Sequence, residues 1–291
     1  MPHKKSRTEK ITIRGLRYNV RHWGKEDAPM VMFLHGWMDC SPTFQFVVDS
    51  LKNPWHIVAP DWQGYGESEW LSRPYWHPDY YADLHDLLKH YSLDRPVRLV
   101  AHSMGSHIAS AYAGICPERV SQLIMLDSLG LKRPMGDDSP TVLGRWLEHV
   151  GNGPPLTLYP NFEAFAARLM ELDHRLSESR ATFLSWNIGR SRADAMVEIA
   201  CDPWHRIPAP LVYHAEDAMA DWMRIKADVL LLVASHGLVK QRFGNDPQEF
   251  ERRIACFRHL QIGSIPDSGH NVQHDQPELV AAALEEFLRR D

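Results

Sequence analysis

The sequence predicts an α/β fold, in which a doubly wound and mostly parallel sheet carries helices on both faces. Short, nearly continuous apolar runs recur along the chain, and such runs are typical of parallel strands buried on both sides. A segment with helical periodicity follows most of these runs, which predicts crossover connections and parallel pairing. The length of 291 residues is enough for one large domain with an insertion.

The first part of the chain supplies most of the expected sheet. Residues 11–23 alternate like one half-exposed strand that is interrupted at Gly15. Ser41 followed by Pro42 predicts an N-cap and the start of a helix that continues to Leu51. The other expected elements are strands over 30–34, 56–60, 96–102 and 122–126, and helices that begin at His77 and Met104, the second of which ends before Pro117.

The character of the chain changes at about Leu131. Up to Arg224 no strand-like run is found, and helices are expected over 162–172 and 178–186 between many prolines. The strand–helix rhythm then resumes, with strands over 228–233 and 260–265 and helices over 247–257 and from Pro277. We therefore expect a core domain of residues 1–130 and 225–291, with residues 131–224 inserted after the sixth strand as a helical cap over the site.

Composition excludes several classes of function. The net charge is −5 and no block of like charge is present, which argues against a nucleic-acid partner. No stretch approaches the ~20 apolar residues of a membrane span, and the basic start of the chain lacks the apolar run of a signal peptide. The four scattered cysteines predict reduced thiols, a cytoplasmic location and no structural zinc. No metal or other cofactor is expected.

The stretch from Ala101 to Gly105 predicts a nucleophile elbow, in which a strand enters a sharp turn that exposes Ser103 and continues into a helix. Taken alone, Ser103 could equally be a polar residue at the end of a core strand. His270, on the loop after the last expected strand, lies at the same edge of the sheet. A serine hydroxyl needs a base, and histidine has the pKa that suits this task, so we predict that His270 activates Ser103.

An oxyanion hole requires two backbone N–H groups that point at the developing negative charge. The residue after the nucleophile, Met104, is expected to supply one, and Trp37, in the loop after the third strand, the other. Gly36 would let that loop approach closely. For His35 we favour a structural role.

Four motifs and their order resemble the α/β-hydrolase family over most of the chain outside the insertion. They are His35-Gly36-Trp37, Asp61-x-x-Gly64-x-Gly66-x-Ser68, His102-Ser103-Met104-Gly105 and Ser268-Gly269-His270. Three further stretches are similar to the serine-hydrolase-like (kraken) group within that family. They are His35 to Asp39, Leu126 to Gly130 and Asp202 to Arg206. In these motifs Asp61 is expected to hold its loop through backbone hydrogen bonds, and His102 to pack.

The resemblance also implies where the third member of the triad should lie. Most family members carry it in a Gly-x-x-Asp turn after the strand that is here 229–233, but this chain has Gly237 in place of the aspartate. Some haloalkane dehalogenases, which resemble this family in fold, carry the acid after the preceding strand, and Asp127 stands there. We therefore predict Asp127 as the acid that orients His270. Asp127 could instead be a turn cap, and then Asp246, Asp267 or Glu216 would be the acid.

What the resemblance implies about activity is an esterase-like serine hydrolase that forms an acyl-enzyme from a small carboxylic ester or related acyl substrate. The predicted cap is rich in Trp, Phe, Leu and Met, which suits an apolar or aromatic acyl group. Two alternatives stay open. One is a cofactor-independent ring-cleaving dioxygenase or lyase on the same scaffold, and the other is a non-catalytic ligand-binding protein. Oligomeric state is not fixed by the sequence.

Overall fold

The computed structural model describes residues 2–131, 138–151 and 154–289 and contains an eight-stranded sheet in the order β1-β2-β4-β3-β5-β6-β9-β10. The strands are β1 (Ser6–Ile13), β2 (Leu16–Trp23), β3 (Met30–Leu34), β4 (His56–Pro60), β5 (Val97–His102), β6 (Val120–Leu126), β9 (Asp228–Ala234) and β10 (Leu260–Ile265). All neighbours are parallel except β1 with β2 and β2 with β4. The predicted doubly wound, mostly parallel sheet is confirmed.

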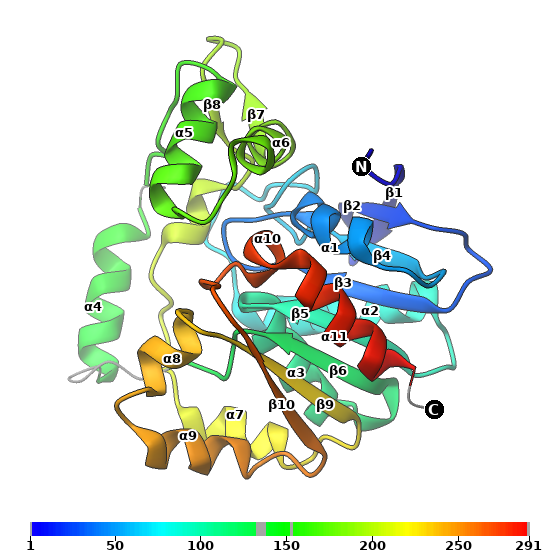
Figure 1. Cartoon of the computed structure of the whole chain (residues 1–291). Coiled ribbons are helices and arrows are strands. Elements are labelled where there is room, and N and C mark those ends of the chain that lie inside the picture. The colour runs from blue at the N-terminus through cyan, green and yellow to red at the C-terminus, as the bar shows by residue number, and fades with distance from the viewer. Residues whose placement is uncertain (1, 132–137, 152–153, 290–291) are drawn as a thin grey trace.

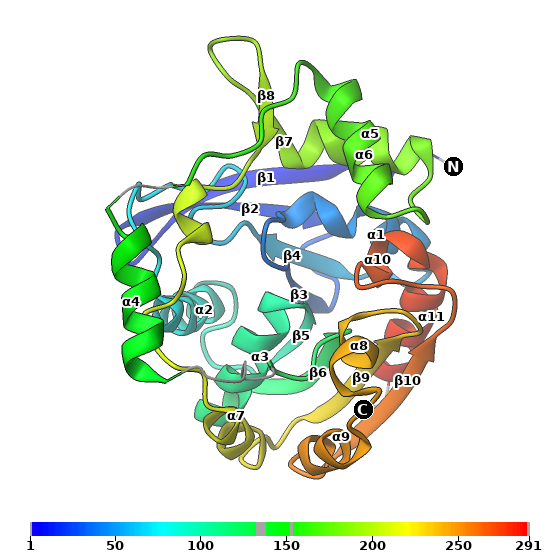
Figure 2. The same cartoon turned by 90° about the vertical axis from the view of Figure 1, so that its left-hand side faces the viewer.

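Helices cover both faces of the sheet, as Figures 1 and 2 show. One face carries α2 (His77–Tyr91), α3 (Met104–Ile115) and α7 (Ala215–Trp222), and the other carries α1 (Gln45–Ser50) and α11 (Pro277–Leu288). Alternate residues of β5 point to opposite faces, so Leu99 and Ala101 belong to one hydrophobic core and Val100 to the other. Burial on both faces explains why the strands are apolar throughout.

Six shorter elements in the described part of the chain lie between these strands and helices. They are the 3₁₀ turns η1 (Ser41–Phe44), η2 (Pro117–Arg119) and η3 (Pro203–Arg206), and the helices α8 (Leu238–Phe243), α9 (Pro247–Ile254) and α10 (Val272–Asp275). The sequence did not predict α8 and α10, because they are too short to show a helical period. Ser41 is the first residue of η1 and not an N-cap, and Cys40 holds that position without a side-chain cap.

The segment expected as a cap contains α4 (Ser139–His149), α5 (Phe162–Leu172) and α6 (Glu178–Ile188), and α5 and α6 stand above the sheet in Figure 1. The expectation that it lacks strands is wrong. Two short antiparallel strands, β7 (Gly189–Ser191) and β8 (Val197–Ile199), follow α6. The boundaries 131–224 remain a prediction, and residues 132–137 and 152–153 lie outside the described part of the chain.

Within that same range, α7 packs on the core. The indole of Trp222, at the end of α7, donates a hydrogen bond to Ser110 Oγ of α3 at 3.1 Å. Trp222, two residues before the end of the predicted cap, therefore packs against α3 on one face of the sheet.

The expected single strand over residues 11–23 is instead a hairpin. Ile13 pairs with Leu16 across a two-residue turn in which Arg14 and Gly15 have φ of 48° and 82°. Such left-handed turns match the twist of paired strands. The first strand begins at Ser6, within a polar stretch, because an edge strand exposes much of its surface.

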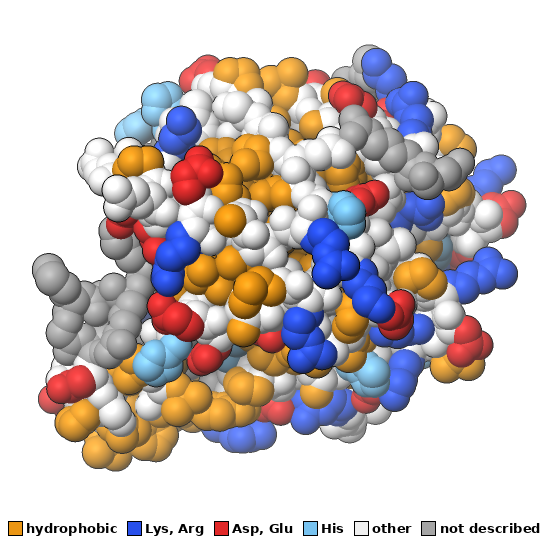
Figure 3. Space-filling view, turned by 90° about the horizontal axis from the view of Figure 1, so that it is seen from below, with side chains coloured by type: hydrophobic (Ala, Val, Ile, Leu, Met, Phe, Trp, Pro, Cys, Tyr) orange, Lys and Arg blue, Asp and Glu red, His pale blue; other side chains and the backbone are white. Residues whose placement is uncertain are grey.

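The face remote from α5 and α6, seen in Figure 3, carries acidic and basic side chains intermingled with apolar ones. It therefore shows no broad field of one sign. In the described ranges, no helix combines the length and the apolar character needed to cross a membrane.

Candidate active site

Ser103 lies at the carboxyl end of β5, where the chain turns sharply into α3. Its backbone has φ of 51° and ψ of −115°, a strained conformation for a residue with a side chain. A Cβ on Gly105 would lie 2.3 Å from the carbonyl oxygen of Leu34, so only glycine lets the first turn of α3 pack against the end of β3. The turn therefore has the form expected of a nucleophile elbow.

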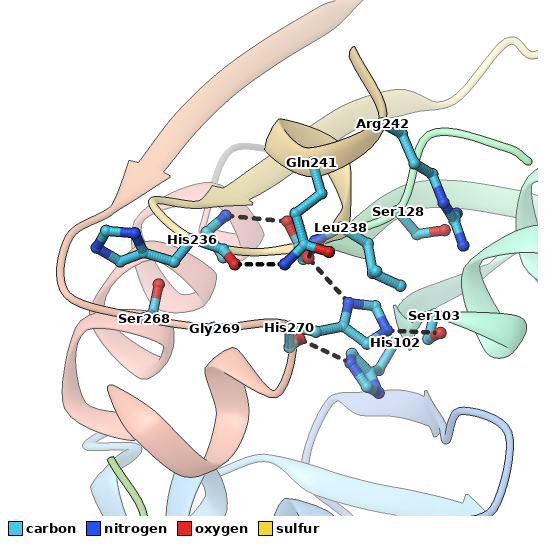
Figure 4. Close-up of polar contacts among 12 residues, drawn as sticks. His102, Ser103, Ser128, His236, Leu238, Gln241, Arg242, Ser268, Gly269 and His270 are labelled. Atoms are coloured by element: carbon cyan, nitrogen blue, oxygen red, sulfur yellow. Dashed lines mark hydrogen bonds and ion pairs between the residues drawn. The ribbon is translucent and has the colours of Figure 1, made fainter. Parts of the chain in front are cut away.

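Sheet register brings three of the predicted residues together, because each follows a strand that ends at the same edge. His270 Nε2 lies 2.8 Å from Ser103 Oγ, a contact visible in Figure 4, and His270 Nδ1 lies 2.8 Å from Asp127 Oδ2. Asp127 is fully buried and the side chain of His270 is 24% exposed. In this geometry Nδ1–H donates to the carboxylate, and Nε2 is left to accept the hydroxyl proton of Ser103.

The carboxylate of Asp127 is anchored by the strand that lacks the usual acid. The N–H of Ala234 donates to Oδ1 at 3.1 Å and the N–H of Leu238 donates to Oδ2 at 2.7 Å. A Cβ on Gly237 would lie 2.1 Å from Oδ2. Since Gly237 has a φ of −87°, which any residue adopts, glycine is needed there for space and not for backbone conformation. The carboxylate of Asp127 occupies the room that a side chain at 237 would need.

The alternative acids lie elsewhere. Asp246 accepts the N–H of Glu249 as the N-cap of α9. Asp267 forms an ion pair with Arg175 at 3.5 Å, and Glu216 forms one with Arg252 at 3.2 Å. Within the described ranges, none of the three is hydrogen-bonded to His270.

The loop proposed for the oxyanion hole packs directly against the elbow. A Cβ on Gly36 would lie 2.9 Å from His102 Nδ1 and 3.1 Å from Ser103 Cβ. Among the residues that the structure describes, the backbone N–H groups of Trp37 and Met104 donate to no protein acceptor. Both N–H groups are therefore free to bind an oxyanion, and their role stays a prediction.

Two histidines near the elbow have structural hydrogen bonds. His35 Nδ1–H donates to its neighbour Gly36 C=O at 2.8 Å while Nε2 accepts the N–H of Trp62 at 2.9 Å. Burial lowers the pKa of His35 to about 4. His102 Nε2 donates to the carbonyl of His270 at 3.0 Å, and burial holds its pKa well below the ordinary value. No sequence pattern predicts this bond, which fixes the backbone of the proposed base.

Asp61 has the structural role that its motif predicts. Its carboxylate accepts the N–H of Ser41 at 2.7 Å and the N–H of Glu67 at 3.1 Å, and also the side-chain amide of Asn19 at 2.8 Å.

A side chain of α6, in the segment expected as a cap (the cap region, residues 131–224), binds the short helix α10 that follows His270. Arg180 of α6 donates to the carbonyls of His274 at 2.7 Å and Asp275 at 3.2 Å. Asp275 Oδ2 in turn accepts the N–H of Gly269 at 2.6 Å, and burial, with Asp173 nearby, raises the pKa of Asp275 to about 6. These bonds connect α6 to the backbone beside His270.

A second attachment of the cap region is a stack of three rings. The imidazole of His205 lies between Tyr65 and Tyr75, with ring centroids 4.0 Å and 3.7 Å away. Its carbonyl accepts the indole N–H of Trp37 at 3.3 Å. The loop of the proposed oxyanion hole is thereby joined to the segment that returns from the cap.

No three His, Cys, Asp or Glu side chains in the described part of the chain are grouped so that they could hold a metal ion. Chemically, the site consists of a serine hydroxyl, an imidazole and a carboxylate joined by two hydrogen bonds.

Known proteins resemble this chain in sequence. A family model described as alpha/beta hydrolase fold matches residues 29–277. A serine hydrolase-like protein of Danio rerio is 26% identical over 279 residues, which span 92% of this chain and 83% of that protein. Serine hydrolase-like protein 2 of Homo sapiens is 23% identical over 288 residues, which span 93% of this chain and 90% of that protein.

Solved structures resemble the whole chain in fold. A thioesterase domain from the curacin biosynthetic pathway superposes with a TM-score of 0.84 at 20% identity, over 97% of this chain and 99% of that one. An esterase of Mycobacterium tuberculosis superposes with a TM-score of 0.72 at 20% identity, over 98% of this chain and 91% of that one.

Proposed function

The chain belongs to the α/β-hydrolase family and resembles its serine-hydrolase-like members, and from this membership we propose that it is an esterase-like serine hydrolase. Its substrate is a small carboxylic ester or a related acyl compound. The observation that carries the proposal is the chain of two 2.8 Å hydrogen bonds from Ser103 through His270 to Asp127.

The mechanism follows from these contacts. Ser103 Oγ attacks the acyl carbonyl carbon while His270 Nε2 takes the hydroxyl proton. The protonated His270 then gives that proton to the leaving oxygen, the ester bond breaks, and the acyl group stays on Ser103. A water molecule, deprotonated by His270, attacks the acyl-enzyme and releases the acid and the free serine. Asp127 holds the tautomer of His270 and stabilises its positive charge.

The N–H groups of Trp37 and Met104 stabilise the oxyanion of both tetrahedral intermediates. Their lack of protein acceptors in the described chain supports this role. Trp37 is 53% exposed and directly follows Gly36, which lies against Ser103, and this supports an apolar or aromatic acyl group as the substrate. Four free cysteine thiols support the cytoplasm as the location.

The test is labelling with a fluorophosphonate, together with hydrolysis of p-nitrophenyl esters of increasing acyl length. We expect Ser103 to be labelled, and Ser103→Ala to lose labelling and to lower kcat by about 10⁶-fold. Ser106→Ala, at a buried serine in the first turn of α3, is the matched control and should still be labelled. The acyl length that gives the highest kcat/KM indicates how long an acyl chain the pocket accommodates.

Two results would contradict the proposal. Absence of both labelling and hydrolysis would favour a non-catalytic ligand-binding protein. Turnover that stops without oxygen would favour a ring-cleaving oxygenase, because hydrolysis needs only water.

A further inference from the structure

Near the candidate active site, one guanidinium has no ion-pair partner among the described residues. Arg242 of α8 is partly buried, and its Nη1 donates to the carbonyl of Gly130 at 3.1 Å. Within the described ranges it forms no ion pair. The nearby Arg253, which is 2% exposed, has its charge balanced by Glu249 at 2.8 Å. Buried charges are normally paired, so Arg242 departs from the rule that Arg253 follows.

The position of Arg242 follows from the same contacts that build the triad. The N–H of Leu238 binds Asp127 Oδ2 at 2.7 Å, and Arg242 comes one turn later, on the same face of α8. Its guanidinium reaches Gly130, three residues after Asp127. Figure 4 shows Arg242 and Ser128 on the side of the His270 ring where Ser103 lies. Burial lowers the pKa of the Arg242 guanidinium below its ordinary value, and the carboxylate of Asp127 acts in the opposite direction.

The groups that interact electrostatically with Arg242 include the carboxylate of Asp127, the phenol of Tyr213 and the guanidinium of Arg253. His107, one turn after Ser103 on α3, lies with its Nε2 3.3 Å from Ser128 Oγ. Burial lowers the pKa of His107 to about 3, so this imidazole is uncharged at neutral pH. Arg253 is already paired with Glu249, so of these two guanidinium groups Arg242 is the one without an ion pair among the described residues, and the 2% exposed Ser128 adds a hydroxyl.

We propose that Arg242 and Ser128 form a subsite for a carboxylate of the substrate. The enzyme then acts on esters that carry a free carboxylate at the far end of a short apolar chain, such as monoesters of dicarboxylic acids. A guanidinium presents paired N–H donors that match a carboxylate, and the half-buried position strengthens the interaction. This inference rests on the proposed function, because it places the carboxylate relative to a carbonyl bound at Ser103.

The experiment compares kcat/KM for monomethyl adipate and methyl hexanoate, which differ in the terminal carboxylate. The measured quantity is the ratio of the two kcat/KM values. We expect Arg242→Gln to lower this ratio by about 10- to 100-fold, as for loss of a hydrogen bond to a charged group. Arg242→Lys keeps a positive charge and should lower the ratio less. Lys240→Gln removes an exposed positive charge from the same helix and is the matched control, with no change of ratio expected.

The outcomes separate the subsite from the proposed function. If Ser103 is labelled by fluorophosphonate but Arg242→Gln leaves the ratio unchanged, or lowers kcat/KM equally for both esters, the subsite is wrong and the hydrolase stands. The equal loss would mean that Arg242 acts through Asp127. If neither ester is cleaved and Ser103 is not labelled, the proposed function fails. The subsite is then judged by calorimetric binding of adipate, which Arg242→Gln must weaken if the subsite is correct.

Discussion

At the scale of single residues, Asp127 and Gly237 depend on each other. The carboxylate of Asp127 accepts N–H groups from Ala234 and Leu238, on both sides of Gly237. The missing side chain at 237 leaves the space that Oδ2 occupies. The glycine that looks like a lost acid in the sequence is thus a requirement of the acid on the neighbouring strand.

The first prediction concerns the identity of the acid. Asp127→Asn should lower kcat by about 10³- to 10⁴-fold, because an amide cannot hold the productive tautomer of His270 or stabilise its charge. Steady-state hydrolysis of the best p-nitrophenyl ester measures this. Asp246→Asn removes a carboxylate from a helix cap and should leave kcat near that of the native chain. The reverse pattern would assign the acid to Asp246.

The second prediction concerns the space at residue 237. Gly237→Ala places a Cβ 2.1 Å from Asp127 Oδ2, so the carboxylate must move. We expect kcat to fall about 100-fold, as for a misplacement of about 1 Å in a catalytic group. Gly144→Ala is the control, because a Cβ at Gly144 meets nothing within 4 Å and its kcat should stay unchanged. An unaltered kcat in Gly237→Ala would mean that the position of Asp127 does not matter to the reaction.

At the scale of elements, the sequence predicts the long helices and strands that have a clear apolar period. It does not predict the short elements, whose position depends on packing. The bounds of α5 and β10 match the predicted ranges, since each has a clear apolar period. The strands of the β7–β8 hairpin have three residues each, too few for alternation to be seen. The β1–β2 turn at Arg14 and Gly15 was misread as a break in one strand, because both strands keep the same alternation.

The candidate site divides in the same way. Ser103, His270 and Asp127 could be predicted because each follows a strand whose end is visible in the sequence. The bond from His102 to the carbonyl of His270, and the approach of Arg242 to Gly130, join residues more than 100 positions apart. No local sequence pattern predicts contacts between residues so far apart in the chain.

The third prediction tests how the cap region is attached to the core. Removing the ring of His205 from between Tyr65 and Tyr75 should lower the free energy of unfolding by about 2–4 kcal/mol, as for other large-to-small changes in packed sites. Urea unfolding of His205→Ala measures the loss. His174→Ala, an exposed histidine of the cap region, should unfold like the native chain. Equal stability of both variants would show that the ring stack contributes nothing.

At the scale of the whole molecule, the fold keeps many histidines uncharged in its interior. Burial lowers the pKa at His22, His35, His56, His102, His107, His205 and His274. Burial has the opposite effect on four carboxyl groups. It raises the pKa of Asp39 to about 7 and that of Asp275 to about 6, and it also raises the pKa of Asp83 and Asp221. The balance of these groups sets the response of stability to pH.

The fourth prediction is that the protein loses stability as pH falls from 7 to 4. A histidine whose folded pKa is depressed binds fewer protons folded than unfolded below pH ~6.5, so each such group lowers the free energy of unfolding by up to about 1.4 kcal/mol per pH unit. The raised pKa values of these four carboxyl groups act the other way, and Asp39 and Asp275 stabilise the fold as pH falls through 7 and 6. The histidines outnumber them, so a net loss is expected.

Urea unfolding followed by tryptophan fluorescence at several pH values measures how the free energy of unfolding changes with pH. One substitution tests whether a buried histidine causes that change. His274 is 6% exposed with a pKa lowered to about 4, and its Nε2 lies 2.6 Å from Thr43 Oγ1. His274→Gln keeps a polar partner for Thr43 but cannot titrate. Between pH 6.5 and 4 its free energy of unfolding should therefore fall less steeply with pH, by the equivalent of about one bound proton. His174→Gln, at an exposed position, should keep the native slope. A free energy of unfolding that stays level or rises on acidification would mean that the buried carboxyl groups, and not the histidines, control the acid stability of this fold.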